Sequence, residues 1–301
     1  MSLPSSSAPE QGPVRPRGTV AEVVSALEAA YPPGTALEWD AVGLVCGDPQ
    51  APVDRVLLAV DPVLDVVEEA VAFGAQLLVV HHPLLLRAVH SVAADTPKGR
   101  IVHRLLTAGC ALYVAHTNAD AAREGVNEAL AELLGLRGLR PIEQGTGAPG
   151  TGIGRVGDLP EPMPLAHLAE LVAGRLPATA QGVRVSGAPE AVVRTVAVCG
   201  GSGDSLFDQV RASGADVFVT ADLRHHPASE ARGHRTDGRP FLVDVAHWAS
   251  EWPWLDRCAG VITDTLGDDV TTRVSTRSTD PWTFHVMQAA EPAATSRGPV
   301  Q

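Results

Sequence analysis

The chain has 301 residues, which is enough for one or two ordinary domains with buried cores. Hydrophobic residues make up 45% of it but aromatic residues only 4%, so we expect a core built from Val, Leu and Ala. The formal net charge of −12 disfavours nucleic acid as a partner. Lys98 is the only lysine among 23 lysine and arginine residues, which excludes a Walker-type phosphate loop.

The ends of the chain and its cysteines give no sign of export or membrane insertion. Residues 1–18 are rich in Pro and Ser without the apolar stretch of a signal peptide, so we expect a disordered lead-in. No apolar run approaches the roughly 20 residues of a membrane span, and we expect a cytoplasmic protein without membrane partners. Four cysteines that lack Cys-x-x-Cys spacing predict buried thiols rather than a zinc ribbon or disulfides: Cys46, Cys110, Cys199 and Cys258.

Residues 19–143 predict a first lobe of alternating helices and strands. A capping box at Thr19 begins the first helix. Asp61, with the proline after it, is expected to cap a second helix that ends at Gly74. The apolar run 77–80 then predicts a strand buried on both faces, as in a sheet covered by helices.

The rest of the chain predicts a boundary region, a second lobe and a tail. Residues 144–194 begin with a stretch rich in Gly, Thr and Pro, which indicates a linker followed by a small inserted unit. Residues 195–288 predict a second α/β lobe, in which 270–287 are expected to form closing strands. The Ala, Ser and Pro residues of 289–301 predict a flexible tail.

The two lobes share one sequence pattern. Residues 72–82 align with residues 212–222, and a matching strand precedes each block. In both halves a later strand ends in Val-Ala-His, followed by an acid four residues after the histidine. We infer an internal duplication and predict an α/β fold of two similar lobes.

The repeated Val-Ala-His signature indicates a metal site. His116 precedes Asp120 by four residues, as His247 precedes Glu251. This spacing supplies one imidazole nitrogen and one carboxylate oxygen to a common point, which is the ligand pair of many hydrolytic metal sites. Taken singly, each acid is equally well explained as an electrostatic cap of a helix N-terminus.

His81 and His82 follow a buried strand, at the sheet edge where open α/β sheets bind ligands. The alternative is a pair of capping or surface histidines, but convergence of two such pairs and two acids favours a site with two metals. Asp222 and His226 occupy the equivalent corner of the second lobe and are expected to support the ligands from behind.

A glycine-rich stretch at 199–205 joins a predicted strand to a predicted helix. Its backbone amides are suited to cradle an anion at the helix N-terminus. A tight turn capped by Asp204 or Ser205 explains the same stretch equally well.

Five motifs in a fixed order resemble the NIF-three-like dinuclear metal centre family, also labelled type-two homologues of GTP cyclohydrolase I. They are W-D-x-V-G at 39–43, H-H-P at 81–83, H-T-N-x-D at 116–120, C-G-G-S-G at 199–203 and H-x-x-x-E at 247–251. The resemblance covers about residues 19–288. It implies two divalent metal ions in the cleft between two lobes, and a toroidal homohexamer with its sites facing an inner cavity.

The resemblance also implies five metal ligands: His81, Asp120 and Glu251 for one ion, and His82, His247 and again Glu251 for the other. It places His116 beside the site rather than on a metal. Histidine and carboxylate ligands accept Zn, Fe, Mn, Co or Ni, so the identity of the metal stays open.

Two functions follow from these residues. The first is a metal-dependent hydrolase, in which a metal-activated water attacks a phosphoester or amide of an unknown small molecule and His116 and Glu251 are catalytic. The alternative is a non-catalytic, metal-binding hexamer that acts as a chaperone or protein-interaction scaffold. Hydrolysis assays on metal-loaded protein distinguish the two.

Overall fold

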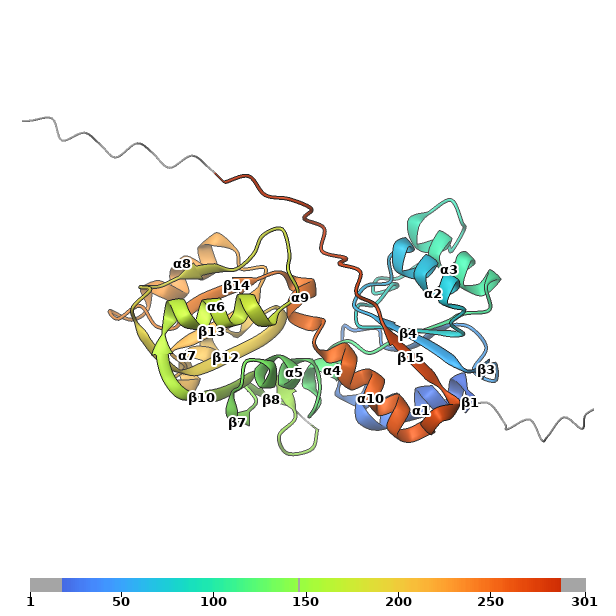
Figure 1. Ribbon diagram of the computed structural model, residues 1–301, viewed down its shortest axis with the longest axis horizontal. Helices are drawn as coiled ribbons and strands as arrows, with labels where there is room; N and C mark the ends of the chain where they lie inside the picture. The colour runs from blue at the N-terminus through green and yellow to red at the C-terminus, as the bar shows by residue number, and fades with distance from the viewer. Residues whose placement is uncertain (1–17, 146, 288–301) are drawn as a thin grey trace, which may run out of the picture.

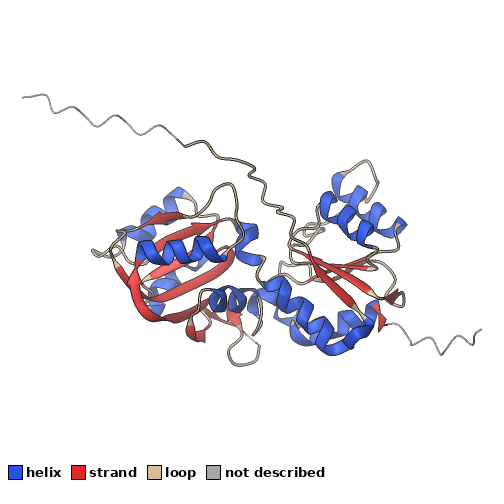
Figure 2. Ribbon diagram, viewed as in Figure 1, coloured by secondary structure: helices blue, strands red, loops and turns tan. Residues whose placement is uncertain are grey.

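The computed structural model describes residues 18–145 and 147–287 (Figure 1). Two main β-sheets with helices packed on both faces make up two lobes, which confirms the α/β class (Figure 2). The expectations for residues 1–17 and 289–301 lie outside the described residues. Within the described part of the chain, none of the helices has the length and apolar character to cross a membrane.

The first sheet has five strands in the order β15-β4-β5-β6-β2. All pairs are parallel except β2 with β6. The strands are β2 (Gly43–Cys46), β4 (Arg55–Ala59), β5 (Leu77–Val80), β6 (Ala111–Val114) and β15 (Thr271–Val274). Two pairs of helices cover its faces: α2 (Leu64–Phe73) with α3 (Pro97–Thr107), and α1 (Val20–Ala30) with α10 (Trp254–Leu266) (Figure 1).

The second sheet has six strands in the order β11-β14-β13-β12-β10-β7, of which β12, β13 and β14 are parallel. The strands are β7 (Arg137–Arg140), β10 (Arg155–Pro164), β11 (Arg184–Ser186), β12 (Val192–Ser202), β13 (Val217–Ala221) and β14 (Phe241–Val245). One face packs against α5 (Val126–Leu133), α6 (Leu165–Arg175) and α9 (His247–Glu251), and the other against α7 (Phe207–Ser213) and α8 (His225–Gly233).

The remaining elements are short. β1 (Gly18–Thr19) pairs with β3 (Pro52–Val53), and β8 (Glu143–Gln144) pairs with β9 (Gly152–Ile153). Helix α4 (Thr117–Ala121) follows β6, and 3-10 turns lie at Pro33–Thr35, Asp204–Leu206 and Gly267–Asp269. The predicted capping box is present at the start of α1, where the Thr19 hydroxyl accepts from the Glu22 amide.

The inner faces of the two sheets share one hydrophobic core. Val79 on β5 and Val219 on β13 belong to the same cluster of buried residues, together with Trp254 of α10. Both sheets contain three consecutive parallel strands linked by helices, β4-β5-β6 and β12-β13-β14. This matching order is consistent with the inferred duplication. The four cysteines are free; Cys110, Cys199 and Cys258 are buried as predicted, whereas Cys46 is only partly buried.

The boundaries between the lobes differ from those expected. β10 and β11, which lie within residues 144–194, join the second sheet rather than a separate unit, and so does β7, which lies among the residues expected in the first lobe. Of the closing strands expected in the second lobe over 270–287, only β15 forms, and it pairs with β4 in the first sheet. The partner of β15 lies more than 200 residues earlier in the chain, so no local pattern identifies this pairing.

Candidate metal centre

Six predicted site residues meet where the carboxyl ends of the parallel strands of both lobes face each other. His81 and His82 directly follow β5, and His116 follows β6. The second lobe contributes α9, which begins at His247 and ends at Glu251. The sixth residue, Asp120, lies on α4. Because β5, β6 and β14 all point toward this region, short helices after them bring distant residues together.

His81 is fully buried and has a fixed orientation. Its Nδ1 lies 2.9 Å from the backbone oxygen of Ala115, which can only accept a hydrogen bond. Nδ1 therefore carries the proton, and in the neutral ring Nε2 has a free lone pair. That Nε2 lies 3.7 Å from Asp120 Oδ1 and 3.5 Å from Glu251 Oε1.

His82 and His247 are each held from behind by a carboxylate. Asp61 Oδ1 lies 2.7 Å from Nδ1 of His82, and Asp222 Oδ2 lies 2.6 Å from Nδ1 of His247. The two Nε2 atoms then face each other at 3.2 Å. Carboxylate–histidine pairs of this kind fix the ring and its tautomer behind a metal ligand.

Glu251 lies at the centre of the group and is 3% exposed. Its Oε1 is 3.0 Å from Nε2 of His247, and its Oε2 is 3.1 Å from Nε2 of His82. Together with the contact to His81, one carboxylate reaches three imidazoles. This is the position that a bridging ligand requires.

The electrostatics of the site follow from this crowding. Burial raises the pKa of the Glu251 carboxyl, but the histidines, His82 first, outweigh that effect and hold it well below its usual value. Burial would lower the pKa of His247, but Glu251 and Asp222 outweigh it and raise the pKa to about 10. The pKa of His81 is likewise raised by Glu251 and Asp120 against the effect of burial. Proton binding at these imidazoles would therefore compete with metal binding.

Three polar atoms of the site are buried and make no hydrogen bond within the described part of the chain. They are His81 Nε2, Asp120 Oδ1 and Glu251 Oε2. Leaving such atoms unsatisfied costs about 1–3 kcal/mol each. A nitrogen lone pair and two carboxylate oxygens form a donor set that a divalent cation would satisfy, so the residues fit a metal.

The glycine-rich stretch packs against the site; it leads into a tight 3-10 turn at Asp204–Leu206 whose N-cap is Gly203, with no side-chain cap, and two of its amides are already bonded within the protein. The amide of Gly200 donates to Asn127 Oδ1 at 2.9 Å, and that of Gly201 to Ser250 Oγ at 2.9 Å. Gly201 has a φ of +66°, and a Cβ there would lie 2.5 Å from Glu251 Oε1. Glycine is therefore needed because the backbone touches the candidate ligands.

A cavity of about 240 Å³ opens onto the site between the lobes. Its walls include His82 and His247, and on the other side Thr279, Asp280 and Trp282 of the segment that follows β15. This segment crosses from the first lobe toward the second (Figure 1). The candidate ligands His82 and His247 therefore line a cleft that is open to small molecules.

A sequence profile described as Duf34/NIF3 (NGG1p interacting factor 3) matches residues 18–281. The chain belongs to the Duf34/NIF3 family. This confirms the resemblance seen in the five motifs, all of which lie within the matched residues.

Relatives of this Duf34/NIF3 chain match over most of their length. The "GTP cyclohydrolase 1 type 2 homolog" of Streptomyces coelicolor is 54% identical over 91% of this chain and 97% of its own. The protein of the same name in Mycobacterium bovis is 37% identical over 87% of this chain and 96% of its own length. Among solved structures, a Bacillus cereus protein related to NIF3 has a TM-score of 0.80 at 25% identity, covering 89% of this chain and 99% of that one. A Staphylococcus aureus hypothetical protein has the same TM-score at 28% identity, over 89% and 100%.

Two supporting residues of this Duf34/NIF3 site were not anticipated from the sequence. Asp40 Oδ1 lies 2.9 Å from Nδ1 of His116, and its Oδ2 accepts from the amide of Thr117 at 3.0 Å. Burial raises the pKa of Asp40, but these hydrogen bonds outweigh it and hold the pKa well below its usual value. Asp40 belongs to the W-D-x-V-G motif, which was the available signal.

The second unanticipated residue is Asp61, which was expected to cap α2. The helix begins at Leu64 with Val63 as its N-cap, and no side chain caps it. Asp61 instead contacts His82 and accepts from the Thr279 hydroxyl.

The expected supporting pair in the second lobe is half correct. Asp222 contacts His247 as expected, whereas the ring of His226 packs against His225 with centroids 5.1 Å apart. His116 was expected beside the ligands, and one of its ring nitrogens lies within 4.8 Å of a ring nitrogen of His81 and of His82, so these three residues could also hold an ion.

Proposed function

We propose that the protein binds two divalent metal ions at this centre and is a metal-dependent hydrolase. The observation that supports it most is a set of three buried polar atoms on His81, Asp120 and Glu251, which make no hydrogen bond to the described residues and lie against other residues of the site. A purely structural core would have satisfied these groups or replaced them by apolar residues.

The geometry favours the following assignment of ligands. His81, Asp120 and Glu251 would hold one ion, since Nε2 of His81 faces both carboxylates. His82, His247 and Glu251 would hold the other, since their atoms gather within 4.8 Å. Glu251 would be shared by the two sets, since its Oε1 lies 3.5 Å from Nε2 of His81 and its Oε2 lies 3.1 Å from Nε2 of His82.

Bound divalent cations would polarise a phosphoryl or carbonyl oxygen and lower the pKa of water toward neutrality. His116 is placed to move a proton, because ionised Asp40 accepts from its Nδ1 and leaves the other nitrogen to take up or release one. A second cavity of about 410 Å³ shares Asp61 and His82 with the first, which leaves room for a substrate beside the ligands. The substrate of the proposed hydrolase would be a small molecule with a phosphoester or amide bond.

The test compares three forms of the metal-loaded protein on panels of phosphoesters, nucleotides and peptides. The wild type should hydrolyse at least one class, Glu251→Gln should lose both bound metal and activity, and His116→Gln should keep metal while losing about 10²-fold or more in kcat. Activity that survives Glu251→Gln sinks the proposed mechanism. Full metal binding by the wild type without hydrolysis of any class would favour the non-catalytic alternative.

From the same resemblance we also propose a homohexamer located in the cytoplasm. Light scattering on the purified full chain tests the assembly, and a mass of one chain contradicts it.

A further inference from the structure

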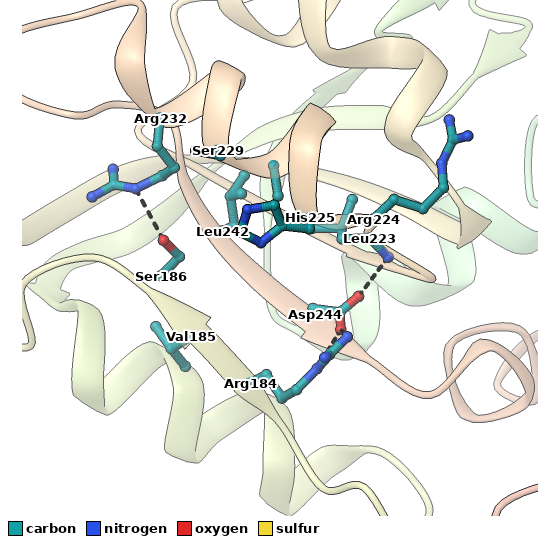
Figure 3. Close-up of a pocket in the computed structure, with 11 residues that line it drawn as sticks. Arg184, Val185, Ser186, Leu223, Arg224, His225, Ser229, Arg232, Leu242 and Asp244 are labelled. Atoms are coloured by element: carbon teal, nitrogen blue, oxygen red, sulfur yellow. Dashed lines mark hydrogen bonds and ion pairs between the residues drawn. The ribbon is translucent and has the colours of Figure 1, made fainter.

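A third cavity lies in the second lobe, away from the candidate metal centre. It has a volume of about 510 Å³ and opens between helix α8 and the edge strand β11 (Figure 3). It shares no lining residue with the cavity at the metal centre. This volume is within the roughly 300–1,000 Å³ of typical small-molecule sites.

The lining of this cavity is basic in an otherwise acidic protein. Arg184, Arg224 and Arg232 all line it, and Asp244 is the only acid that does so. The chain as a whole has a net charge of −12. A local excess of guanidinium groups against that background selects for an anionic ligand.

Two of these arginines are available to a ligand. The side chain of Arg184 is 63% exposed and pairs with Asp244, and that of Arg224 is 74% exposed and pairs with Asp204. The acids are the less exposed partners, at 7% for Asp244 and 13% for Asp204, and they hold the arginines in place. Each guanidinium has five N–H donors, so those not used by its acid remain available to a bound anion.

Arg232 is held more firmly. Its Nε donates to Ser186 Oγ at 3.1 Å, and its guanidinium lies over the ring of Phe241, 4.9 Å from the centroid. Its Nη1 is buried beside Gly238, so this nitrogen is not open to a ligand. Arg232 therefore contributes a fixed positive charge to this end of the cavity, which favours the oxygens of a phosphate.

The middle of the cavity is apolar. Figure 3 shows Arg232 with Ser186 at one end, Arg184 with Asp244 at the other, and Leu242 and the His225 ring between them. A free phosphate ion would leave this middle part unused. A ligand with both an anionic group and an apolar body would use the whole cavity.

We propose that this cavity binds a small organic phosphate. One or more of the arginines hold the phosphate oxygens, and the apolar or aromatic body of the ligand lies against Leu242 and the ring of His225. The site is independent of the metal centre.

The test uses phenyl phosphate as the probe and isothermal titration of the full-length protein, both metal-loaded and stripped with EDTA. Saturable binding of one equivalent is expected in both forms, with weaker binding of inorganic phosphate, which lacks the body, and of phenol, which lacks the charge. Arg184→Gln and Arg232→Gln should each weaken the binding of phenyl phosphate by about tenfold or more. Arg235→Gln is the matched control, since Arg235 is an exposed neighbour paired with Asp237 outside the cavity, and it should leave the affinity unchanged.

Ser229→Trp is a second variant that fills the cavity from an exposed position of α8 and leaves every arginine in place. It should abolish binding without lowering the Tm. Unchanged affinity in this variant and in the two arginine variants would overturn the proposal, as would the absence of saturable binding. Binding that appears only with metal and disappears in Glu251→Gln would place the phosphate at the metal centre and would also overturn it.

Discussion

Asp61 Oδ1 lies 2.7 Å from Nδ1 of His82, and the other oxygen of Asp61 accepts a hydrogen bond from Thr279. The carboxylate thereby fixes the ring so that Nε2 faces Glu251 at 3.1 Å. In the second lobe, Asp222 orients the ring of His247 in the same way. Each half of the molecule thus supplies an acid that orients a candidate ligand.

We expect Asp61→Asn and Asp222→Asn each to weaken metal binding by about 10–100-fold, because the imidazoles lose their fixed orientation and part of their basicity. Competition titrations of zinc against a chromophoric chelator measure this change. Asp208→Asn is the control, since Asp208 is 84% exposed at its side chain and remote from the site. Wild-type affinity in both site variants would show that these contacts do not support a metal.

Gly201→Ala adds only one methyl group, but it should displace the candidate metal ligands. The added Cβ would overlap Glu251 Oε1 at 2.5 Å and His247 Nε2 at 2.9 Å, so the candidate ligands must move. Gly214→Ala is the matched control, because Gly214 also has a positive φ, of +78°, but has nothing within 4 Å of the added carbon. Both should lose about 1 kcal/mol of unfolding free energy for the backbone conformation, measured in urea. Only Gly201→Ala should also lose bound metal, and equal metal content in the two variants would contradict the account.

Metal binding and protonation should compete. Glu251 and Asp222 raise the pKa of His247 to about 10, so its charged form stabilises the metal-free fold below the ordinary value of 6.5. That contribution is lost as pH rises toward about 10. The Tm of EDTA-treated protein should therefore fall between about pH 7 and about pH 10, and the gain in Tm on adding zinc should increase over the same range. The same slope in His247→Gln would rule out this histidine as the origin.

Arg155 is expected to be a major contributor to stability. It is 1% exposed, and it donates to the backbone oxygens of Ala122, Gly152 and Gly154 and to Glu128. Arg155→Met would leave these acceptors without their donors, at a cost of about 3–5 kcal/mol in urea unfolding. Arg140→Met, which removes one exposed contact to Ser213, should cost less than about 1 kcal/mol. A loss below about 1 kcal/mol for Arg155→Met would show that the buried contacts contribute little.

Local patterns predicted much of the fold. The uninterrupted apolar run of β5 identified a strand buried on both faces, and Gly74 ends α2 in the left-handed conformation as expected. The aligned halves predicted the position of Asp222, which stands where His82 stands in the first lobe. These features are set by neighbouring residues, so the sequence reveals them directly.

Long-range relationships were less predictable. A carboxylate before a proline can serve as a helix cap or as the partner of a histidine. The residues near Asp61 do not indicate that it contacts His82, which lies 21 residues away. Ser250 lies inside α9, where its hydroxyl donates to the backbone of His247 and accepts from Gly201, 49 residues away, and the second contact has no local sequence signal. The return of β15 to the first sheet likewise depends on pairing with β4, whose residues lie far from β15 in the sequence.

The measurement that tests the central claim most directly is the number of metal ions bound per chain. The purified protein is stripped with EDTA, reloaded with zinc or manganese in separate samples, dialysed, and examined by elemental analysis beside Glu251→Gln. The two-metal centre predicts two tightly bound ions per wild-type chain with at least one of the metals, and no more than one in the variant. One ion or none in every wild-type sample, or two in Glu251→Gln, would contradict it.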